Sequence, residues 1–272
     1  MTEQSSHNVG PLWCPSWDGA SYAANTGHHR VHDADFLASC PLRPADRVLD
    51  VGCGAGDFTR AIADLVPHGL VLGADPQASM LDQAAGRAGR NQRFVLATVQ
   101  GLETALAGED PFDVAVSRAV FHWVPAADTP DAYRQVRDHL LPGGWFRLEC
   151  GGAGNIPASL ALMDDESRRV GGPTCPWHFA SASWALDHLE RAGFDVRAGF
   201  VRLVAQRRTF DRAALLGWLH SQALLAYTVS MTASDAAAFT AGVEGRVDEL
   251  RRWDGSYDQT WVRLDALVQR PA

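Results

Sequence analysis

The stretch VLDVGCGAGDFT, residues 48–59, decides the fold of this chain. An apolar run carrying one acid, Asp50, leads into Gly52, Gly54 and Gly56, and then into a segment with helical spacing. A glycine-rich turn between a strand and a helix lets backbone N–H groups come close to a ligand. The stretch therefore predicts a strand, a ligand-binding loop and a helix, in that order.

Strand and helix patterns alternate along the chain as far as residue 150. Helical spacing is present at 58–66 and 78–89, and Thr129-Pro130-Asp131 has the features of a helix start. Short apolar strands are predicted at 47–51, 70–75, 93–98, 112–117 and 145–150. This alternation predicts an α/β fold, a Rossmann-like, doubly wound and mostly parallel sheet with helices on both faces.

The remainder of the chain is less regular. We predict a helix at 180–193, an alternating strand at 194–210, and a glycine- and proline-rich mobile loop pair around one short helix at 151–179. Two further helices, at 211–227 and 233–253, precede a last strand at 259–270. The predicted parts are an N-terminal arm with lid helices (1–46), a cofactor-binding core (47–150), and a C-terminal part (151–272) that completes the sheet and carries a helical cap at about 211–253.

The composition limits the class of protein. The chain has 272 residues, 46% of them hydrophobic, and a formal net charge of −8. This apolar fraction supports a full core, and the negative charge without a basic block disfavours nucleic-acid binding. No apolar run is long enough to span a membrane, and the first ten residues lack a secretory pattern.

Cysteine and histidine usage points to a cytoplasmic protein without a metal. The five cysteines are far apart and form no C-x-x-C spacing, which indicates reduced thiols in a cytoplasm. The cluster HHRVH at 28–32 is the arrangement that invites a metal-site hypothesis. Its two adjacent histidines diverge and no carboxylate partner is evident, so we expect no metal.

The loop and its neighbouring acids indicate the chemistry of the ligand. The dinucleotide fingerprint G-x-G-x-x-G requires glycine at position 57, where the chain has Asp57. Asp50 beside the loop would repel a pyrophosphate and attract a cationic amino group. Asp75, 19 residues after Gly56, ends the next predicted strand, where a carboxylate can accept both hydroxyls of a ribose. The site therefore favours S-adenosylmethionine over NAD.

On these residues the chain resembles the class I S-adenosylmethionine-dependent methyltransferases. VLDVGCGAGDFT matches their first motif, and GADPQASMLDQA at 73–84 matches the segment after it. The resemblance implies that the glycine loop wraps the methionine part, that Asp75 takes the ribose, and that S-adenosylhomocysteine is a product. Thr98 stands where the family often has an acid for the adenine amino group. The other implied cofactor-binding residues are Cys53, Pro76, Gln77, Val99, Ser117, Arg118, Tyr22 and Arg30.

A narrower resemblance connects the chain with the trans-aconitate and juvenile-hormone-acid types of methyltransferase. SRAVFHWVPAAD at 117–128 resembles their segment after strand four, and WDGASYAANTGHHR at 17–30 resembles their N-terminal segment. A helical cap before the last strand is the third similarity. These similarities imply a small-molecule acceptor.

Aromatic residues near the predicted catalytic edge are candidates for the acceptor pocket. His122 is the candidate general base or pocket residue, because it follows strand four at the edge where ligands bind. The other substrate-binding candidates are Trp17, Trp123, Trp177, His178, Trp218 and Tyr227. For any single aromatic residue, ordinary core packing is the competing interpretation.

The sequence leaves several reactions open. We expect methyl transfer to an oxygen of a small molecule, either a carboxylate or a hydroxyl, in natural-product tailoring. N- or C-methylation, a non-methylating rearrangement or cyclisation, and a non-enzymatic cofactor sensor are the alternatives. The sequence predicts no nucleic-acid or membrane partner and does not distinguish a monomer from a homodimer.

Overall fold

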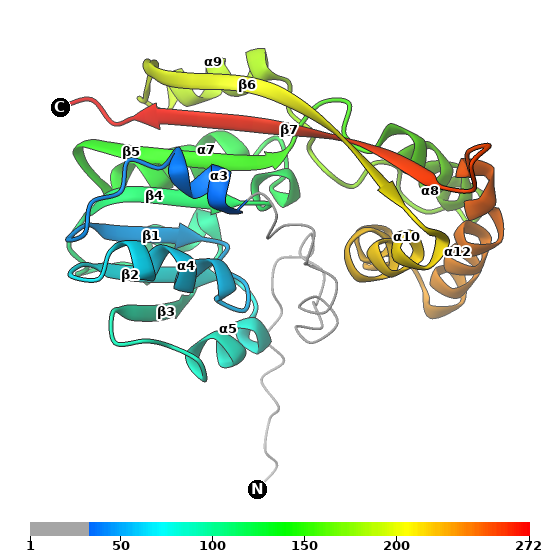
Figure 1. The fold of residues 1–272 in the computed structure, drawn as a ribbon, viewed down its shortest axis with the longest axis horizontal. Helices are drawn as coiled ribbons and strands as arrows, with labels where there is room; N and C mark the ends of the chain where they lie inside the picture. The colour runs from blue at the N-terminus through cyan, green and yellow to red at the C-terminus, as the bar shows by residue number, and fades with distance from the viewer. Residues whose placement is uncertain (1–32) are drawn as a thin grey trace, which may run out of the picture.

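The protein is represented by a computed structural model, and the residues it describes are 33–272 (Figure 1). Trp17, Tyr22 and Arg30, which the sequence placed at the site, lie outside the described residues. A seven-stranded sheet has the order β3-β2-β1-β4-β5-β7-β6, with β7 antiparallel to both of its neighbours. The strands are β1 (Arg47–Val51), β2 (Leu70–Asp75), β3 (Gln92–Leu96), β4 (Phe112–Arg118), β5 (Leu140–Gly151), β6 (Asp195–Phe210) and β7 (Tyr257–Gln269).

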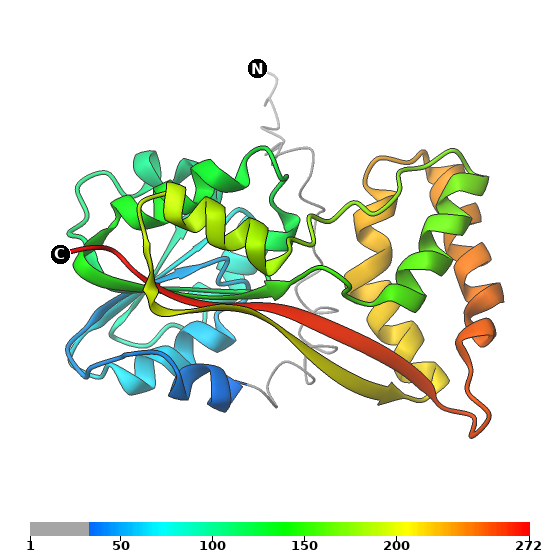
Figure 2. The ribbon, with the colours of Figure 1, turned by 90° about the horizontal axis from the view of Figure 1, so that it is seen from above.

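Helices cover both faces of this sheet, and a second group lies beyond the carboxyl ends of strands β1, β4 and β5 (Figure 2). The helices around the sheet are α3 (Asp33–Ala38), α4 (Asp57–Leu65), α5 (Ala78–Ala85), η1 (Val99–Gly101), α6 (Leu102–Ala105), η2 (Phe121–Trp123), α7 (Thr129–Asp138) and α9 (Ala182–Arg191). The second group consists of α8 (Pro157–Arg169), α10 (Arg212–Trp218), η3 (Leu219–Ala223), α11 (Leu224–Thr228), α12 (Ala233–Arg246) and η4 (Val247–Leu250).

The alternation of side chains along each strand determines the two apolar layers. Val48 of β1 packs with Phe36 of α3 and Ile62 of α4 on one face. Leu49, the next residue, packs on the other face with α6, α7 and α9. Successive strand residues point to opposite faces, so strands covered on both sides are apolar throughout. The predicted Rossmann-like, mostly parallel fold is thereby confirmed.

The chain reverses its direction of travel across the sheet between β1 and β4. β2 and β3 lie on one side of β1, whereas β4 and β5 lie on the other. In open α/β sheets, ligands bind at the carboxyl ends of the strands flanking such a switch point. The glycine loop after β1 and the segment after β4 therefore meet at the position where a ligand is expected.

The strands β6 and β7 continue beyond the other strands as a two-stranded arm (Figure 1). Gly151, the last residue of β5, is opposite Arg263 of β7. From Val262 back to Tyr257, β7 pairs with β6 alone. The arm carries the cap helices, and its residues Tyr257 and Trp261 belong to the apolar core of the cap.

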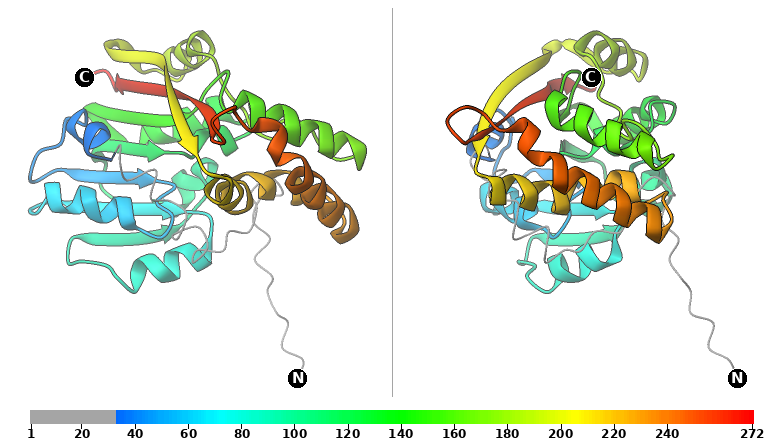
Figure 3. Two further views of the ribbon diagram at one scale, coloured as in Figure 1. Left: turned by 45° about the vertical axis from the view of Figure 1, so that its right-hand side comes forward. Right: turned by 90° about the vertical axis from the view of Figure 1, so that its right-hand side faces the viewer.

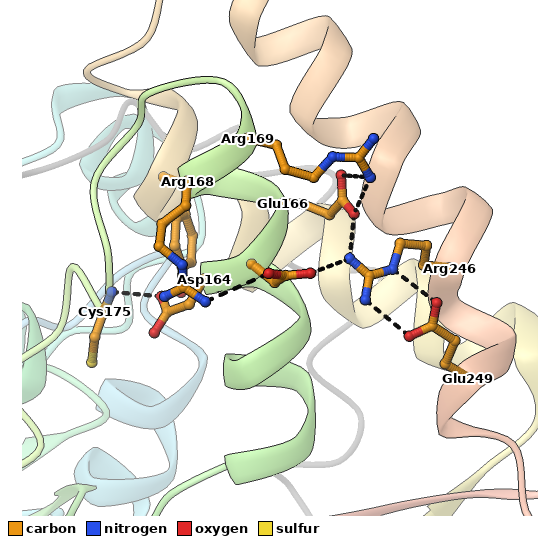
Figure 4. A network of polar contacts seen from close by, with 9 residues as sticks. Asp164, Glu166, Arg168, Arg169, Cys175, Arg246 and Glu249 are labelled. Atoms are coloured by element: carbon orange, nitrogen blue, oxygen red, sulfur yellow. Dashed lines mark hydrogen bonds and ion pairs between the residues drawn. The ribbon is translucent and has the colours of Figure 1, made fainter.

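The cap contains one helix more than the sequence indicated. The 151–179 region was predicted to be loops around a short helix, but α8 has 13 residues and packs against α12 (Figure 3). Figure 4 shows Arg246 of α12 between Glu166 and Glu249. Arg246 also forms an ion pair with Asp165. Glu166 is buried and accepts a hydrogen bond of 2.6 Å from Arg246, which joins α8 to α12. The cap is therefore built from two separate segments of the chain.

The helix predicted at 211–227 is interrupted in the structure. Residues Leu219–Ala223 form a π-helical turn between α10 and α11. Such wide turns occur as single insertions in helices, frequently near functional sites. Here the turn brings Gln222 and Ala223 onto the wall of the cavity described below.

Candidate functional site

A cavity lies at the carboxyl ends of β1, β2 and β4, between the sheet and the cap. Its wall combines the glycine loop, the ends of these strands, the arm and the cap helices. The described lining residues are Val51, Gly52, Gly54, Ala74, Asp75, Pro76, Gln77, Met80, Ala97, Thr98, Val99, Leu102, Arg118, Ala119, Val120, His122, Trp123, Val124, Asn155, Ile156, Trp177, Phe179, Trp218, Gln222, Ala223, Trp261 and Arg263.

Two glycines of the loop have different physical reasons to be glycine. Both have positive φ, 77° at Gly52 and 53° at Gly54. A β-carbon on Gly52 would lie 2.1 Å from Cγ2 of Val120, so this glycine allows the loop to pack against the segment after β4. A β-carbon on Gly54 would meet nothing within 4 Å. Gly54 therefore leaves room for a ligand to approach the backbone.

Asp75 is held by the backbone at the end of β2. Its Oδ2 accepts a hydrogen bond of 2.9 Å from the Gly54 N–H, and its Oδ1 accepts one of 2.9 Å from the Gln77 N–H. Burial raises the pKa of this carboxyl, and the two backbone hydrogen bonds oppose the shift. The side chain lines the cavity, so a fixed acceptor faces the ligand.

Four of the expected cofactor residues lie behind the loop rather than on the cavity wall. Asp50 is buried, accepts a hydrogen bond of 2.7 Å from Thr59 Oγ1, and has its pKa raised to about 7 by burial. Ser117 donates to the Val51 carbonyl at 2.9 Å, and Cys53 is also buried. Gly56, with φ of 81°, packs against Ala84 of α5. The structure thus shows no direct exposure of these residues to the cavity.

The remaining cofactor residues form an apolar slot with polar ends. Pro76, Gln77, Thr98 and Val99, which the sequence assigns to the cofactor, all line the cavity, and Met80 extends the apolar wall. A flat adenine ring fits apolar walls of this kind, while the carboxylate beside it fits the ribose. The cradle at Gly54 and the carboxylate of Asp75 together match S-adenosylmethionine.

His122 is partly buried and lines the cavity. Its Nδ1 accepts a hydrogen bond of 3.3 Å from the Gly151 N–H, which leaves the proton of the neutral ring on Nε2. Burial, assisted by the positive charge of Arg263, lowers the pKa of His122 to about 3. A ring this weakly basic suits a hydrogen-bond donor and does not suit a general base. The expectation that His122 acts as a base is therefore not supported.

Aromatic rings form the cap side of the cavity. Trp123 and Trp177 stand edge to face with centroids 5.7 Å apart, and Trp177 stacks on Phe179 at 5.6 Å. Trp218 of α10 meets Trp261 of β7 at 5.0 Å. The predicted Trp123, Trp177 and Trp218 all line the cavity, whereas Trp261 and Phe179 were not predicted.

Two predicted substrate residues are placed elsewhere. His178 stands against Trp184 of α9, with ring centroids 4.4 Å apart, and is absent from the described cavity wall. The hydroxyl of Tyr227 donates to Asp164 at 2.6 Å, and its ring stacks on Phe239 inside the cap. Neither residue is on the described cavity wall, because these rings pack between helices.

Two arginines bring positive charge to the cavity wall. Arg118 ends β4, forms an ion pair with Glu149 at 3.4 Å, and stands over the rings of Phe36 and Phe58. Arg263 of β7 is buried and stands over Trp261 at 5.0 Å. In the sequence, Arg263 is recognisable only as one residue of the alternating last strand. The pattern did not reveal that the arm turns this side chain toward the cavity.

Two further features bear on ligands. Among residues 33–272, no three histidine, cysteine or acidic side chains are grouped so that they could bind a metal ion. In the same range, no helix combines the length and apolarity that a membrane span requires.

The sequence of the chain is similar to that of known methyltransferases. Residues 49–146 match a protein family described as a methyltransferase domain. A trans-aconitate 2-methyltransferase of Deinococcus radiodurans is 29% identical over 243 residues, which cover 81% of this chain and 88% of that protein. One of Streptomyces coelicolor is 32% identical over 167 residues. That second match covers 58% of this chain and spans about half of the relative, 53% of its length.

Solved structures share the fold. The YcgJ protein of Bacillus subtilis superposes with a TM-score of 0.61 at 18% identity, covering 90% of this chain and all of that one. A phosphoethanolamine N-methyltransferase of Haemonchus contortus, in complex with S-adenosyl-L-methionine, superposes with a TM-score of 0.59 at 15% identity, over 93% of this chain and 57% of that one. The fold, the loop and the relatives together identify S-adenosylmethionine as the cofactor.

Proposed function

The chain belongs to the S-adenosylmethionine-dependent methyltransferases, and we propose on that premise that it methylates a carboxylate of a small organic acid. The name of the Deinococcus radiodurans relative, which covers most of both chains, supports this class of acceptor. The aromatic wall of the cavity extends the proposal to ring-bearing acids, including acidic natural products. The product is then a methyl ester.

The main support for this proposal is the set of titratable side chains on the cavity wall. Among the described lining residues, the titratable side chains are Asp75, Arg118, His122 and Arg263. Asp75 is held at the cofactor end by two backbone N–H groups, and the pKa of His122 is about 3. None of these groups is suited to removing a proton from a hydroxyl or an amine. A carboxylate needs no base, because it is already an anion near neutral pH.

The residues of the chain supply position and charge in this proposal. S-adenosylmethionine, when bound, supplies an electrophilic methyl group. Arg263 and Arg118 attract the acid, and the Nε2–H of His122 donates a hydrogen bond to it. The tryptophans of the cap exclude water and limit the orientations of the acceptor, which is the main contribution a protein makes to an in-line displacement.

We propose a corresponding division of the described chain. The sheet with α3 to α7 and α9 holds the cofactor, whereas the arm and the cap hold the acceptor. The cap in this division comprises residues 157–169 as well as 211–250.

A screen with labelled cofactor tests the proposal. The protein is incubated with methyl-labelled S-adenosylmethionine and with separate panels of small carboxylic acids, phenols and amines. We expect label to enter the acids, in products that gain one methylene unit in mass and release the label as methanol in base. Label that enters only phenols or amines would overturn the proposal, and a product of unchanged mass would indicate a rearrangement.

A further inference from the structure

A short turn between β5 and α8 holds one amide side chain on the cavity wall. The turn comprises residues 152–156, and its Asn155 is only 6% exposed and lines the cavity. Oδ1 of Asn155 accepts a hydrogen bond of 2.9 Å from the backbone N–H of Val262 on the arm. A backbone N–H can only donate, so this bond determines which end of the amide is the oxygen. The other end is Nδ2, a group with two N–H donors.

The backbone of this turn is bound to the arm at both ends. The Gly152 N–H donates to the Val262 carbonyl at 2.9 Å. The Ile156 N–H donates to the Thr260 carbonyl at 2.8 Å. Ile156 has φ of 43°, a rare conformation for a β-branched side chain, and such strain persists where the surrounding structure fixes it, often at ligand sites. The turn is therefore a rigid support for Asn155.

Nδ2 of Asn155 lies beside the strand end that also orients His122. A β-carbon on Gly151 would lie 3.0 Å from this Nδ2 and 2.7 Å from Cε1 of Phe179, so the glycine leaves space for both side chains. The Gly151 N–H donates to Nδ1 of His122 at 3.3 Å, which leaves the proton of the neutral ring on Nε2. Asn155 and His122 both line the cavity. They form a pair of donors that backbone N–H groups hold in place.

The donors of Nδ2 are available to a ligand. Within the described part of the chain, no group accepts a hydrogen bond from Nδ2 of Asn155. Buried polar groups in folded proteins are normally hydrogen-bonded, and one without a partner is unfavourable. Since Asn155 lines the cavity, an oxygen atom of a bound acceptor can supply the missing partner.

We propose that Asn155 is a binding residue for the acceptor, and that its Nδ2 donates to the carboxylate oxygen that is not methylated. The Nε2–H of His122 donates to the same oxygen. The inference rests on the proposed function, since it concerns the same carboxylate. The other oxygen forms the new O–C bond as the S–C bond of the cofactor breaks. The electron pair of the broken bond stays on sulfur, and no proton moves.

The pair of donors selects the chemical class of the acceptor. A carboxylate has two oxygens on one carbon, so one can react while the other accepts the hydrogen bonds. A phenol has a single oxygen for both tasks, and an amine presents N–H groups to the two donors. Donors that lose their acceptor in a closed site weaken binding of the wrong ligand. Asn155 therefore favours carboxylates over phenols and amines without carrying a charge itself.

Substitution of Asn155 tests the donor. Asn155→Asp keeps an oxygen for the Val262 N–H and replaces Nδ2 by a second oxygen. At pH 8 we expect KM for trans-aconitate to rise about 100-fold, because a donor is lost and two carboxylates face each other. Asn155→Ala removes the donor without adding charge and should raise KM about tenfold, with kcat changed less than about threefold. An unchanged KM in both variants would overturn the inference.

A pH series separates a binding role from a purely structural one. Once the carboxyl group introduced by Asn155→Asp is protonated, its O–H can donate in place of Nδ2. The ratio of its KM to the wild-type KM should therefore shrink at least about fivefold from pH 8 to pH 6, because burial beside an anion raises the pKa of a carboxyl. The corresponding ratio for Asn155→Ala should stay constant. A ratio for Asn155→Asp that does not change with pH would overturn the inference.

Gln135 of α7 provides a matched control. Its Oε1 accepts a hydrogen bond of 2.8 Å from the Glu103 N–H, and it is not on the described cavity wall. Gln135→Glu makes the same change from amide to carboxylate beside a backbone donor, so KM for trans-aconitate should stay within about twofold of the wild-type value. A rise as large as that in Asn155→Asp would show that added negative charge anywhere in the fold weakens the acid, and would overturn the inference.

A binding measurement separates failure of this inference from failure of the proposed function. trans-Aconitate is titrated calorimetrically into the protein with S-adenosylhomocysteine present. We expect Asn155→Ala to bind the acid about tenfold more weakly, with the affinity for S-adenosylhomocysteine within about twofold of wild type. Methylation of acids with equal acid affinity in both proteins would overturn the inference and leave the proposed function standing. Weaker binding in the variant without methylation of any acid would support the donor and overturn the proposed function.

Discussion

The two ends of the cavity are built in contrasting ways. The cofactor end comes from one continuous part of the chain, and its key carboxylate, Asp75, is held by backbone N–H groups of Gly54 and Gln77. The acceptor end is assembled from the end of β4 and the segment after it, the arm, the segments before and after α8, and the π-helical turn. Its titratable side chains are Arg118, His122 and Arg263.

This contrast indicates which end of the cavity is fixed by the cofactor and which end can vary with the acceptor. At the cofactor end, backbone donors fix the position of the Asp75 carboxylate, so that end has little room to vary. Side chains on the arm and cap can be exchanged without disturbing the sheet. Loops and insertions at the carboxyl edge of a sheet carry specificity for this reason.

The largest expected effect is at the cofactor end. Asp75→Ala should weaken binding of S-adenosylhomocysteine roughly 500-fold, because two ribose hydroxyls lose a charged acceptor. Isothermal titration calorimetry measures the change. Asp82→Asn, an exposed acid on α5, is the control and should bind normally. A loss below tenfold in Asp75→Ala would show that the cofactor end does not depend on this carboxylate.

Two glycine variants separate the fold from the ligand. Gly52→Ala should lower the free energy of unfolding by about 3 kcal/mol, because the added carbon meets Val120 at positive φ. Gly54→Ala adds a carbon into open space, so its stability loss should be near 1 kcal/mol while affinity for S-adenosylhomocysteine falls at least tenfold. Urea unfolding and calorimetry check the pair, and similar profiles for both variants would contradict the distinction.

The partly buried imidazole of His122 at the acceptor end should make stability depend on pH. The pKa of His122 is depressed to about 3 in the folded protein, so the unfolded chain binds a proton that the folded one does not between about pH 6.5 and 3. Stability therefore falls as pH drops through this window. From pH 6.5 to 5, the wild-type protein should lose about 1.5 kcal/mol more than His122→Gln.

Comparing the wild-type protein with His122→Gln removes the contribution of Asp50, which changes with pH in the opposite direction. The pKa of Asp50 is raised to about 7, so the folded protein keeps this proton at pH values where the unfolded chain has lost it. The contribution of Asp50 to the free energy of unfolding therefore falls as pH rises toward 7. Asp50 is present in both the wild-type protein and His122→Gln, and its contribution cancels in the difference. If urea unfolding shows that the two proteins lose the same free energy of unfolding between pH 6.5 and 5, a neutral His122 in the folded protein is contradicted.

The smallest expected effect concerns the adenine slot. Thr98 stands where related enzymes often carry an acid, and it lines the cavity. Thr98→Asp should leave the affinity for S-adenosylhomocysteine unchanged or tighten it by up to about threefold, since an acid can accept from the adenine amino group. A large loss in calorimetry would show that the slot holds the adenine in a different place.

The sequence predicted the cofactor end well because its information is local. Gly52, Gly54, Asp75 and Thr98 lie within one strand-loop-helix-strand-helix-strand run, where spacing alone fixes their place at the sheet edge. The boundaries were less accurate. β5 begins at Leu140, five residues before the predicted start, because its first residues pair with β4 around a bulge.

The acceptor end was only partly predictable because long-range packing decides it. Trp177 and Tyr227 are equally aromatic in the sequence, yet one lines the cavity and the other is bonded to Asp164 inside the cap. Arg263 and Arg208 appeared as alternating residues of strands, and only the β6–β7 register places them around Trp261. No local pattern encodes which face of a two-stranded arm turns toward a cavity.

The pH dependence of turnover tests the central claim, that the acceptor end receives an acceptor already carrying its negative charge. The measurement is kcat with saturating S-adenosylmethionine and trans-aconitate between pH 6.5 and 9. The account predicts a kcat that stays constant within about twofold, since no group on the protein has to remove a proton. A tenfold rise in kcat per pH unit below an apparent pKa in this range would contradict it.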